Sequence, residues 1–152
     1  MSQCHTDNIM TDDDKLLLEN QTCFPLYSAA NAVIRAYRPL LDELDLTYSQ
    51  YLVMIVLWEK DGASVKELGS QLHLDSGTLT PLLKRLETKG YVERGRSETD
   101  ERVRVLNLTE QGRDLREHAK SVPNAMMCKI SLELDEMIML KKLCGKVLDN
   151  LG

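Results

Sequence analysis

One cysteine, Cys23, lies where a helix is predicted to begin. The segment 21–33 reads QTCFPLYSAANAV, and apolar residues continue at three- and four-residue steps beyond it. This spacing predicts an amphipathic helix over about residues 25–44, with Pro25 as its first residue and a bend at Pro39. The unpaired N–H groups at a helix start stabilise a thiolate, the reactive form of cysteine. Cys23 is therefore a candidate redox residue; the alternative is an inert core thiol, because free cysteines are commonly buried.

The remaining cysteines, Cys4, Cys128 and Cys144, are scattered and form no CxxC pair. This spacing argues against a metal site, and no other cofactor is indicated. The first fifteen residues are polar and acidic without a signal-peptide pattern, and no stretch of the sequence approaches the length of a membrane span. We expect a cytoplasmic protein whose cysteines rest as thiols, so that any disulfide would be transient and regulatory.

The net charge of −5 is unevenly distributed along the 152 residues. Between Ser64 and Arg104 there are eight Lys or Arg and seven Asp or Glu, a balance of +1. The rest of the chain carries eleven against seventeen, or −6. The acidity therefore lies outside the middle third, and the overall sign of the charge does not exclude nucleic-acid binding there.

The middle of the chain carries clear helix start and stop signals. TYSQ at 47–50 and SVKE at 64–67 are capping boxes, and the first opens the apolar run YLVMIVLWEK. The second opens a short helix that ends before the turn HLDSG. The segment TLTPLLKRLETKG then predicts a further helix, which Gly90 closes.

The start of that further helix has two solutions in the sequence. It begins either at Ser76, with a bend at Pro81, or at Pro81 with Thr80 as the cap. Two alternating strands follow, YVERG and VRVLNL, which flank the charged tip RSETDER at 96–102. This order of elements predicts a mainly α fold with a small β-hairpin, the winged helix-turn-helix.

The second helix of such a unit fits the major groove of DNA, which is about 12 Å wide. Hydroxyl side chains at its start can reach phosphates or base edges, and cations follow along it, including Lys89. Arginines around the hairpin tip can enter a minor groove, with Asp100 orienting Arg102. The candidate DNA-binding residues are Ser76, Thr78, Thr80, Lys84, Arg85, Arg96, Asp100, Arg102 and Arg104. A merely solvated charged surface is the alternative, which the order of elements disfavours.

The helical pattern resumes at Thr109, breaks at Pro123 and ends with a last helix from about Asp135. The first and last helices are more apolar than a small core needs, which predicts that they pack against a second copy of the chain. We expect a disordered polar tail, a helix for dimerisation with the sensor cysteine, a winged helix-turn-helix domain and C-terminal dimerisation helices. These segments are expected at residues 1–15, 16–46, 47–108 and 109–152.

Two stretches together resemble a known family over about residues 23–112. SVKELGSQLHLDSGTLTPLLKRLETKGYVERGRSETDERVRVLNLTEQG looks like the DNA-binding core of MarR-type regulators, including the D-x-R of the wing. CFPLYSAANAVIRAYRPLLDELDLTYSQYLVMIVLWE is similar to the organic-hydroperoxide-sensing (OhrR-like) repressors within that family. The resemblance implies a MarR-type homodimer that represses from a pseudo-palindromic DNA operator and is released when an organic hydroperoxide oxidises its N-terminal cysteine.

The resemblance also assigns roles to residues of this chain. Tyr37 and Tyr48 match two tyrosines whose hydroxyls bind the sulfur of the partner chain, and Tyr27 is a weaker candidate for which core packing is the alternative. Cys128 corresponds in position to the resolving cysteine of the two-cysteine type, which converts a sulfenic acid at Cys23 into an intersubunit disulfide. Cys144 is expected in the core, and Cys4 receives no role.

Two rival interpretations stay open at this point. A MarR-type regulator could instead be released by a small aromatic ligand in the dimer cleft, with Cys23 incidental. A thiol peroxidase is the other rival, but an enzyme needs turnover with a reductant, and the sequence offers no second catalytic group. We therefore expect a regulator and not an enzyme.

Overall fold

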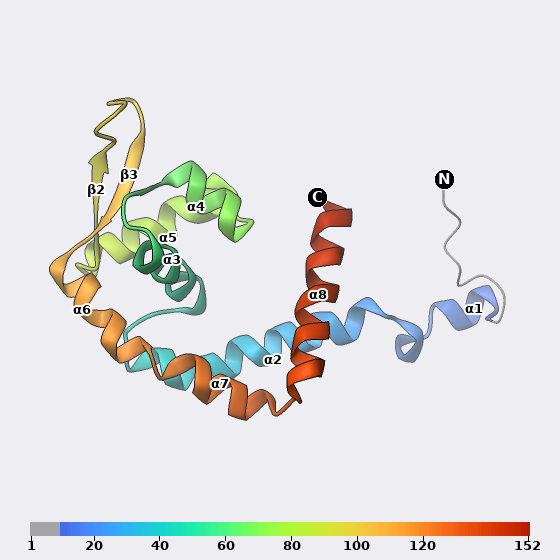
Figure 1. Ribbon diagram of the computed structural model, residues 1–152. Helices are drawn as coiled ribbons and strands as arrows, with labels where there is room; N and C mark the ends of the chain where they lie inside the picture. The colour runs from blue at the N-terminus through green and yellow to red at the C-terminus, as the bar shows by residue number, and fades with distance from the viewer. Residues whose placement is uncertain (1–9) are drawn as a thin grey trace. The chain divides into compact units, whose positions relative to one another are not determined.

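The computed structural model describes residues 10–152, which divide within a helix into two compact units, one ending at Arg35 and one spanning Ala36–Gly152. The first unit holds α1 (Asp12–Lys15), the 3-10 helix η1 (Leu18–Asn20) and the beginning of α2 (Cys23–Asp42) (Figure 1). Helix α2 begins and ends two residues earlier than the sequence pattern predicts. Cys4 lies outside the described residues.

The second unit is mainly helical with a small sheet, which confirms the predicted fold class. After α2, its elements are α3 (Tyr48–Glu59), β1 (Ala63–Ser64), α4 (Val65–Leu72), α5 (Ser76–Thr88), β2 (Val92–Arg96), β3 (Arg104–Leu108), α6 (Glu110–Ala119), α7 (Val122–Ile130) and α8 (Leu134–Leu151). Helices α4 and α5 with the β2–β3 hairpin form the predicted helix-turn-helix and wing, and the hairpin projects beyond the helices (Figure 1).

Both predicted capping boxes are present. Thr47 Oγ1 accepts the N–H of Gln50 at 3.3 Å, and Gln50 Oε1 accepts the N–H of Thr47 at 3.0 Å. Ser64 Oγ and the Glu67 carboxylate make the equivalent pair at 3.0 and 3.1 Å. These side chains satisfy N–H groups that a helix cannot pair internally, so α3 and α4 begin where the sequence predicts.

Helix α5 begins at Ser76, which decides between the two solutions for its start. Asp75 is the cap, because its Oδ1 accepts the N–H of Thr78 at 2.7 Å. Pro81 therefore lies inside the helix, and Thr80 Oγ1 donates to the carbonyl oxygen of Ser76 at 2.8 Å. At the other end, the chain reverses through a left-handed residue, Gly90, at φ +83°.

The described residues contain one three-stranded antiparallel sheet in the order β1-β3-β2. Strand β1 was not anticipated; it has two residues, and Ala63 pairs with Leu106 of β3. The register pairs Arg96 with Arg104, so these two arginines lie on the strands, and the connection between them, residues 97–103, is shifted by one position from the predicted tip.

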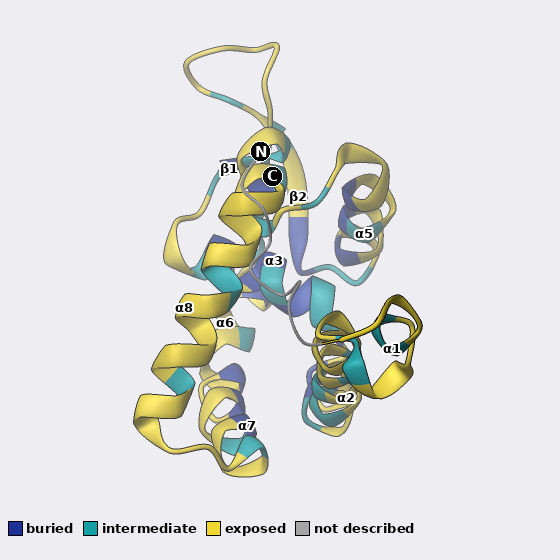
Figure 2. Ribbon diagram, turned by 90° about the vertical axis from the view of Figure 1, so that its right-hand side faces the viewer, coloured by how far each residue is buried: buried dark blue, intermediate teal, exposed yellow. Residues whose placement is uncertain are grey.

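One hydrophobic core joins α3, α4, α5 and the sheet. Its fully buried members include Leu41, Val53, Met54, Leu57, Leu68, Leu79, Leu83, Leu86, Val92 and Leu106. Helix α8 takes no part in this core, because none of its described residues, 134–151, is buried (Figure 2). Its exposed apolar residues are Leu134, Ile138, Met139, Leu140, Leu143, Val147, Leu148 and Leu151. Within residues 10–152, no helix combines the length and hydropathy that a membrane crossing needs.

Candidate redox site and nucleic-acid interface

The thiol of Cys23 belongs to the first residue of α2 and is exposed. The predicted first helical residue, Pro25, is the third residue of the helix, where a proline is tolerated because the first N–H groups have no partner within the helix. The position at the helix start is therefore confirmed, with the boundary moved by two residues. In the single chain, Cys23 is therefore not part of the core, and its redox role stays a prediction.

The other described thiols differ in accessibility. Cys128 is exposed on α7, whereas Cys144 on α8 is half-buried. The sequence placed Cys144 in the core, but α8 contributes no buried residue from positions 134–151 of the single chain. Tyr27 is 67% exposed and is not packed in a core of this chain.

The second unit brings three tyrosine rings together. The ring centroids of Tyr37 and Tyr48 are 4.7 Å apart, and Tyr51 lies 5.9 Å from Tyr37 and 6.4 Å from Tyr48. Sequence reasoning identified Tyr37 and Tyr48 but missed Tyr51, which is buried. Its signal was present in the spacing, because positions three apart on one helix share a face.

All three phenols keep their protons at neutral pH. Burial raises the pKa of Tyr37, and the neighbouring Tyr48 and Tyr51 raise it further. Burial also raises the pKa of Tyr48, and burial followed by the influence of Tyr48 raises that of Tyr51. The pair predicted to support a thiolate therefore consists of O–H donors, which is the form needed to stabilise a negative sulfur.

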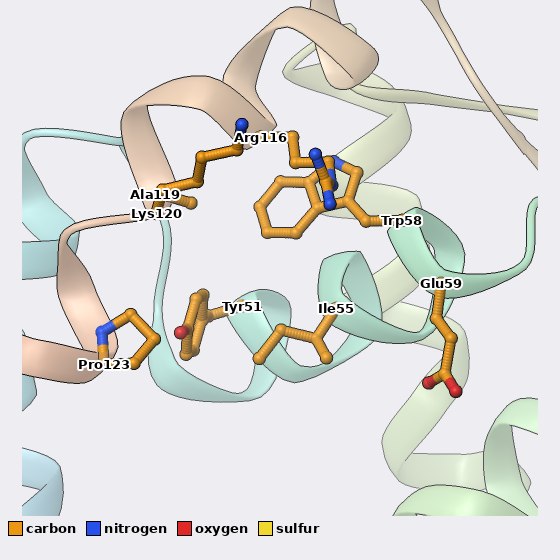
Figure 3. A pocket seen from close by; sticks show the side chains of 8 residues that line it. All are labelled: Tyr51, Ile55, Trp58, Glu59, Arg116, Ala119, Lys120 and Pro123. Atoms are coloured by element: carbon orange, nitrogen blue, oxygen red, sulfur yellow. The ribbon is translucent and has the colours of Figure 1, made fainter.

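A cavity of about 400 Å³ lies between α3 and the α6–α7 segment, with Tyr51 in its wall (Figure 3). Ile55, Trp58 and Pro123 supply further apolar lining, while Arg116 and Lys120 bring positive charge and Glu59 brings one negative charge. The indole N–H of Trp58 donates to the carbonyl oxygen of Gly112 at 2.9 Å, which fixes that ring against α6. The cavity was not foreseen from the sequence, because its walls come from segments about 60 residues apart.

The candidate DNA-binding residues are all exposed. Five of them, Ser76, Thr78, Thr80, Lys84 and Arg85, lie on α5. The cap of this helix is itself charged: hydrogen bonds from the backbone and side chain of Thr78 lower the pKa of Asp75. The exposed residues of α5 thus present hydroxyls in the first half of the helix and cations in the second half.

The wing carries the remaining four candidates. Asp100 Oδ1 accepts the N–H of Arg102 at 3.0 Å and lies 3.6 Å from Arg102 Nε. Asp100 therefore orients the arginine, whose side chain is 94% exposed. Arg96 and Arg104 lie opposite each other on β2 and β3, so three arginines are presented at one end of the hairpin.

Lys89 does not join the exposed cations of α5. Its Nζ donates to the carbonyl oxygen of Asp45 at 2.5 Å and to Gln50 Oε1 at 2.9 Å. The sequence pattern grouped Lys89 with Lys84 and Arg85. That grouping is wrong, because the Lys89 side chain bonds to Asp45 and Gln50, which lie between the end of α2 and the first turn of α3. Within residues 10–152, no group of three or more His, Cys, Asp or Glu side chains could hold a metal ion.

Comparison with known proteins gives a family and several close relatives. The family model described as transcriptional regulator SarA/Rot matches residues 35–118. The chain is 52% identical over 124 residues to the HTH-type transcriptional regulator TtmR of Methylorubrum extorquens, covering 82% of this chain but only 64% of TtmR. It is 49% identical over 114 residues to the organic hydroperoxide resistance transcriptional regulator of Bacillus subtilis, covering 75% of this chain and 78% of that protein.

Solved structures of AbfR, a protein of Staphylococcus epidermidis, are also similar. Reduced AbfR bound to DNA is 36% identical, with a TM-score of 0.72 over 89% of this chain and 94% of that one. Overoxidized AbfR bound to DNA is 33% identical, with a TM-score of 0.74 over 93% and 100%. Disulfide-formed AbfR is 34% identical, with a TM-score of 0.62 over 86% and 92%.

These similarities confirm the resemblance to the organic-hydroperoxide regulators that the sequence indicated. The relatives are named as transcriptional regulators and not as enzymes. The two-cysteine type stays a prediction. The chain belongs to the SarA/Rot family of transcriptional regulators, a MarR-like group with the winged-helix fold.

Proposed function

We propose that the chain is a homodimeric repressor that binds pseudo-palindromic operator DNA while Cys23 is reduced and dissociates when an organic hydroperoxide oxidises Cys23. One observation carries the proposal: an exposed thiol occupies the first position of α2 in a chain that also carries a winged helix-turn-helix. The B. subtilis relative named for organic hydroperoxide resistance supports the same stimulus.

In this proposal α5 enters the major groove and the wing arginines enter an adjacent minor groove. The exposed hydroxyls of Ser76, Thr78 and Thr80 face phosphates or base edges, and Arg102 is held in place by Asp100. A dimer positions two such helices about 34 Å apart, one turn of DNA. The reduced AbfR structure, described as bound to DNA, supports this mode of binding.

The second copy is proposed to cover the apolar residues that the single chain leaves exposed. Helix α8 has eight large apolar residues in contact with solvent along its length. Phe24, Leu26 and Ile34 of α2 are also more than 40% exposed. A monomer rarely leaves apolar surface of this extent uncovered, so we assign these helices to the dimer interface.

The redox chemistry begins with attack of the Cys23 thiolate on the peroxide oxygen. The O–O bond breaks, the sulfur gains one oxygen as sulfenic acid, and the alkoxide takes a proton and leaves as an alcohol. The thiol of Cys128 from the other subunit then displaces water from the sulfenic acid and forms the disulfide. The hydroperoxide is the two-electron oxidant, and no further co-reactant is required.

The tyrosine pair is proposed to stabilise the thiolate of the other subunit. The hydroxyls that bind the Cys23 sulfur are proposed to come from the partner, as the resemblance to the hydroperoxide-sensing repressors implies. Tyr37 and Tyr48 remain protonated donors at neutral pH because burial raises the pKa of each.

The disulfide, not sulfur oxidation alone, is proposed to release DNA. AbfR is described as bound to DNA in both its reduced and overoxidized forms, and separately in a disulfide form. A disulfide between Cys23 and Cys128 would displace α2 and move the two recognition helices from their spacing. Loss of two charge-assisted hydrogen bonds, at about 1.5–3 kcal/mol each, would weaken binding by about 10²–10⁴-fold.

Fluorescence anisotropy with a labelled operator tests the proposal. Addition of cumene hydroperoxide should release the wild-type protein, and dithiothreitol should restore binding. Cys23→Ser should bind the operator as the reduced wild type does and remain bound after oxidant. Release of Cys23→Ser by the hydroperoxide would show that another group is the sensor.

The cavity beside Tyr51 favours a second candidate function, regulation by a small aromatic ligand. Its volume of about 400 Å³ lies within the range of about 300–1,000 Å³ for small-molecule sites. The rings of Tyr51 and Trp58 suit an aromatic ligand, and the two lining cations outnumber the one lining carboxylate, Glu59, which favours a ligand with one negative charge. Under this candidate, benzoate-type ligands release DNA equally from wild type and Cys23→Ser, whereas the hydroperoxide proposal predicts no such release.

A further inference from the structure

The C-terminal end of α5 is tied to the corner between α2 and α3 by directional hydrogen bonds. Lys89 Nζ donates to the carbonyl oxygen of Asp45 at 2.5 Å and to Gln50 Oε1 at 2.9 Å. The hydroxyl of Tyr91, two residues later, donates to the buried carbonyl oxygen of Leu44 at 3.0 Å. These contacts join positions 39 to 47 residues apart in sequence, all within the second unit.

One oxygen atom serves both helices. Gln50 Oε1 accepts the N–H of Thr47, as part of the capping box that starts α3, and also accepts Lys89 Nζ from the end of α5. The Gln50 side chain is almost fully buried, at 2% exposed. Its position is therefore fixed by packing, and a movement of the first turn of α3 changes the distance from this oxygen to Lys89.

The same first turn of α3 carries the tyrosines. Tyr48 precedes Gln50 by two residues and Tyr51 follows it directly, and the Tyr48 ring packs on Tyr37 at 4.7 Å. Asp45, the other acceptor of Lys89, has a left-handed backbone at φ +54° just before this turn. A displacement of Tyr48 thus acts on the turn that supplies an acceptor of Lys89.

We propose that Gln50 and Lys89 form the link that passes a displacement of the Tyr37–Tyr48 pair to the recognition helix α5. Lys89 is then a positioning residue and not a phosphate contact. The core leucines of α5 hold the helix by apolar packing, which is non-directional, whereas the Lys89 bonds fix its C-terminal end relative to α3. The inference rests on the proposed function and names how the thiol would govern the DNA-binding surface.

The first experiment measures the ratio of operator Kd in oxidised and reduced protein for wild type, Lys89→Met and Lys60→Met. Lys60 is an exposed lysine at the other end of α3, so Lys60→Met makes the same change in charge outside the link. The ratio should fall by about fivefold or more in Lys89→Met, a typical allosteric coupling factor, and stay at the wild-type value in Lys60→Met. An unchanged ratio in Lys89→Met, or an equal fall in both variants, would overturn the link.

A second readout needs no oxidation. Because coupling between sites is reciprocal, operator binding should shift the ring ¹³C signals of Tyr48 in the full-length reduced protein and should fail to shift them in Lys89→Met. Equal shifts in both proteins, or none in the wild type, would reject the link. If oxidant fails to release wild type while these shifts behave as expected, the hydroperoxide proposal falls and the link stands. Lys89→Gln replaces Lys89→Met if circular dichroism shows the latter unfolded.

Discussion

Replacement of Gly112 by alanine should destabilise the fold, because α6 approaches the backbone before β2 too closely to admit a side chain. A Cβ at Gly112 would lie 2.1 Å from the carbonyl oxygen of Tyr91 and 3.3 Å from Leu108 Cδ2. Both atoms are held: the Tyr91 carbonyl accepts the N–H of Thr109 at 3.1 Å, and Leu108 is buried. The helix must therefore move away from the sheet by about 1 Å to restore ordinary contact.

The loss in free energy of unfolding can be estimated from the contacts that are disturbed when α6 moves away from the sheet. Overpacking of a tight core contact costs about 1–3 kcal/mol. The carbonyl oxygen of Gly112 accepts the indole N–H of Trp58 at 2.9 Å, and loss of this hydrogen bond adds about 1 kcal/mol. Alanine regains about 1 kcal/mol over glycine within a helix. The net loss is about 1–3 kcal/mol, a fall in Tm of about 2–12 °C for a chain of this size.

Thermal and urea unfolding at one fixed protein concentration measure the effect, since a dimer makes Tm depend on concentration. Asp114→Ala is the matched control, because Asp114 is exposed on the same helix and its replacement should change stability by less than about 0.5 kcal/mol. Trp58 fluorescence should change in Gly112→Ala only. Wild-type stability in Gly112→Ala would refute the packing described for α6.

Three further predictions concern the thiols, the recognition helix and the tyrosines. After treatment with hydroperoxide, Cys128→Ser should lack the cross-linked dimer on non-reducing gels; a surviving cross-link would assign the partner of Cys23 to another cysteine. The N–H of Thr78 lowers the pKa of Asp75 from 3.8, so the cap stabilises the fold above that pH and this stabilisation is lost as pH falls through the lowered value. Asp75→Ala should therefore lower stability at pH 6 and flatten its decline from pH 4 to 2, as followed by urea titration; an unchanged decline would contradict this role. Tyr48→Phe should slow oxidation of Cys23 in stopped-flow measurements without weakening operator binding, and a wild-type rate would remove the tyrosine from the sensor.

Local signals in the sequence predicted the helices well. The capping residues Thr47 and Ser64 act within three residues of their partners, so the pattern alone determines where α3 and α4 begin. The start of α5 was ambiguous because Pro81 suits either the first turn or a helix interior. The Asp75 cap resolved it, since its carboxylate binds the N–H of Thr78.

Features that depend on distant contacts could not be predicted in the same way. Strand β1 has only two residues, and it exists because Ala63 pairs with Leu106. Lys89 reads as one more cation on α5, and only the tertiary fold brings it to Asp45, 44 positions away. The position of Cys23 at the start of α2 could be predicted because neighbouring residues in the sequence determine where a helix begins. The proposed contacts of Cys23 with a partner subunit depend instead on assembly of the dimer.

The most direct test of the central claim is titration of the operator complex with cumene hydroperoxide, with anisotropy and free thiol measured in the same samples. The account predicts that DNA is released in step with loss of both the Cys23 and the Cys128 thiols, that release is complete at about one equivalent of peroxide per subunit, and that it is absent in Cys23→Ser. Loss of both thiols with the DNA still bound, or release while both stay reduced, would contradict the account.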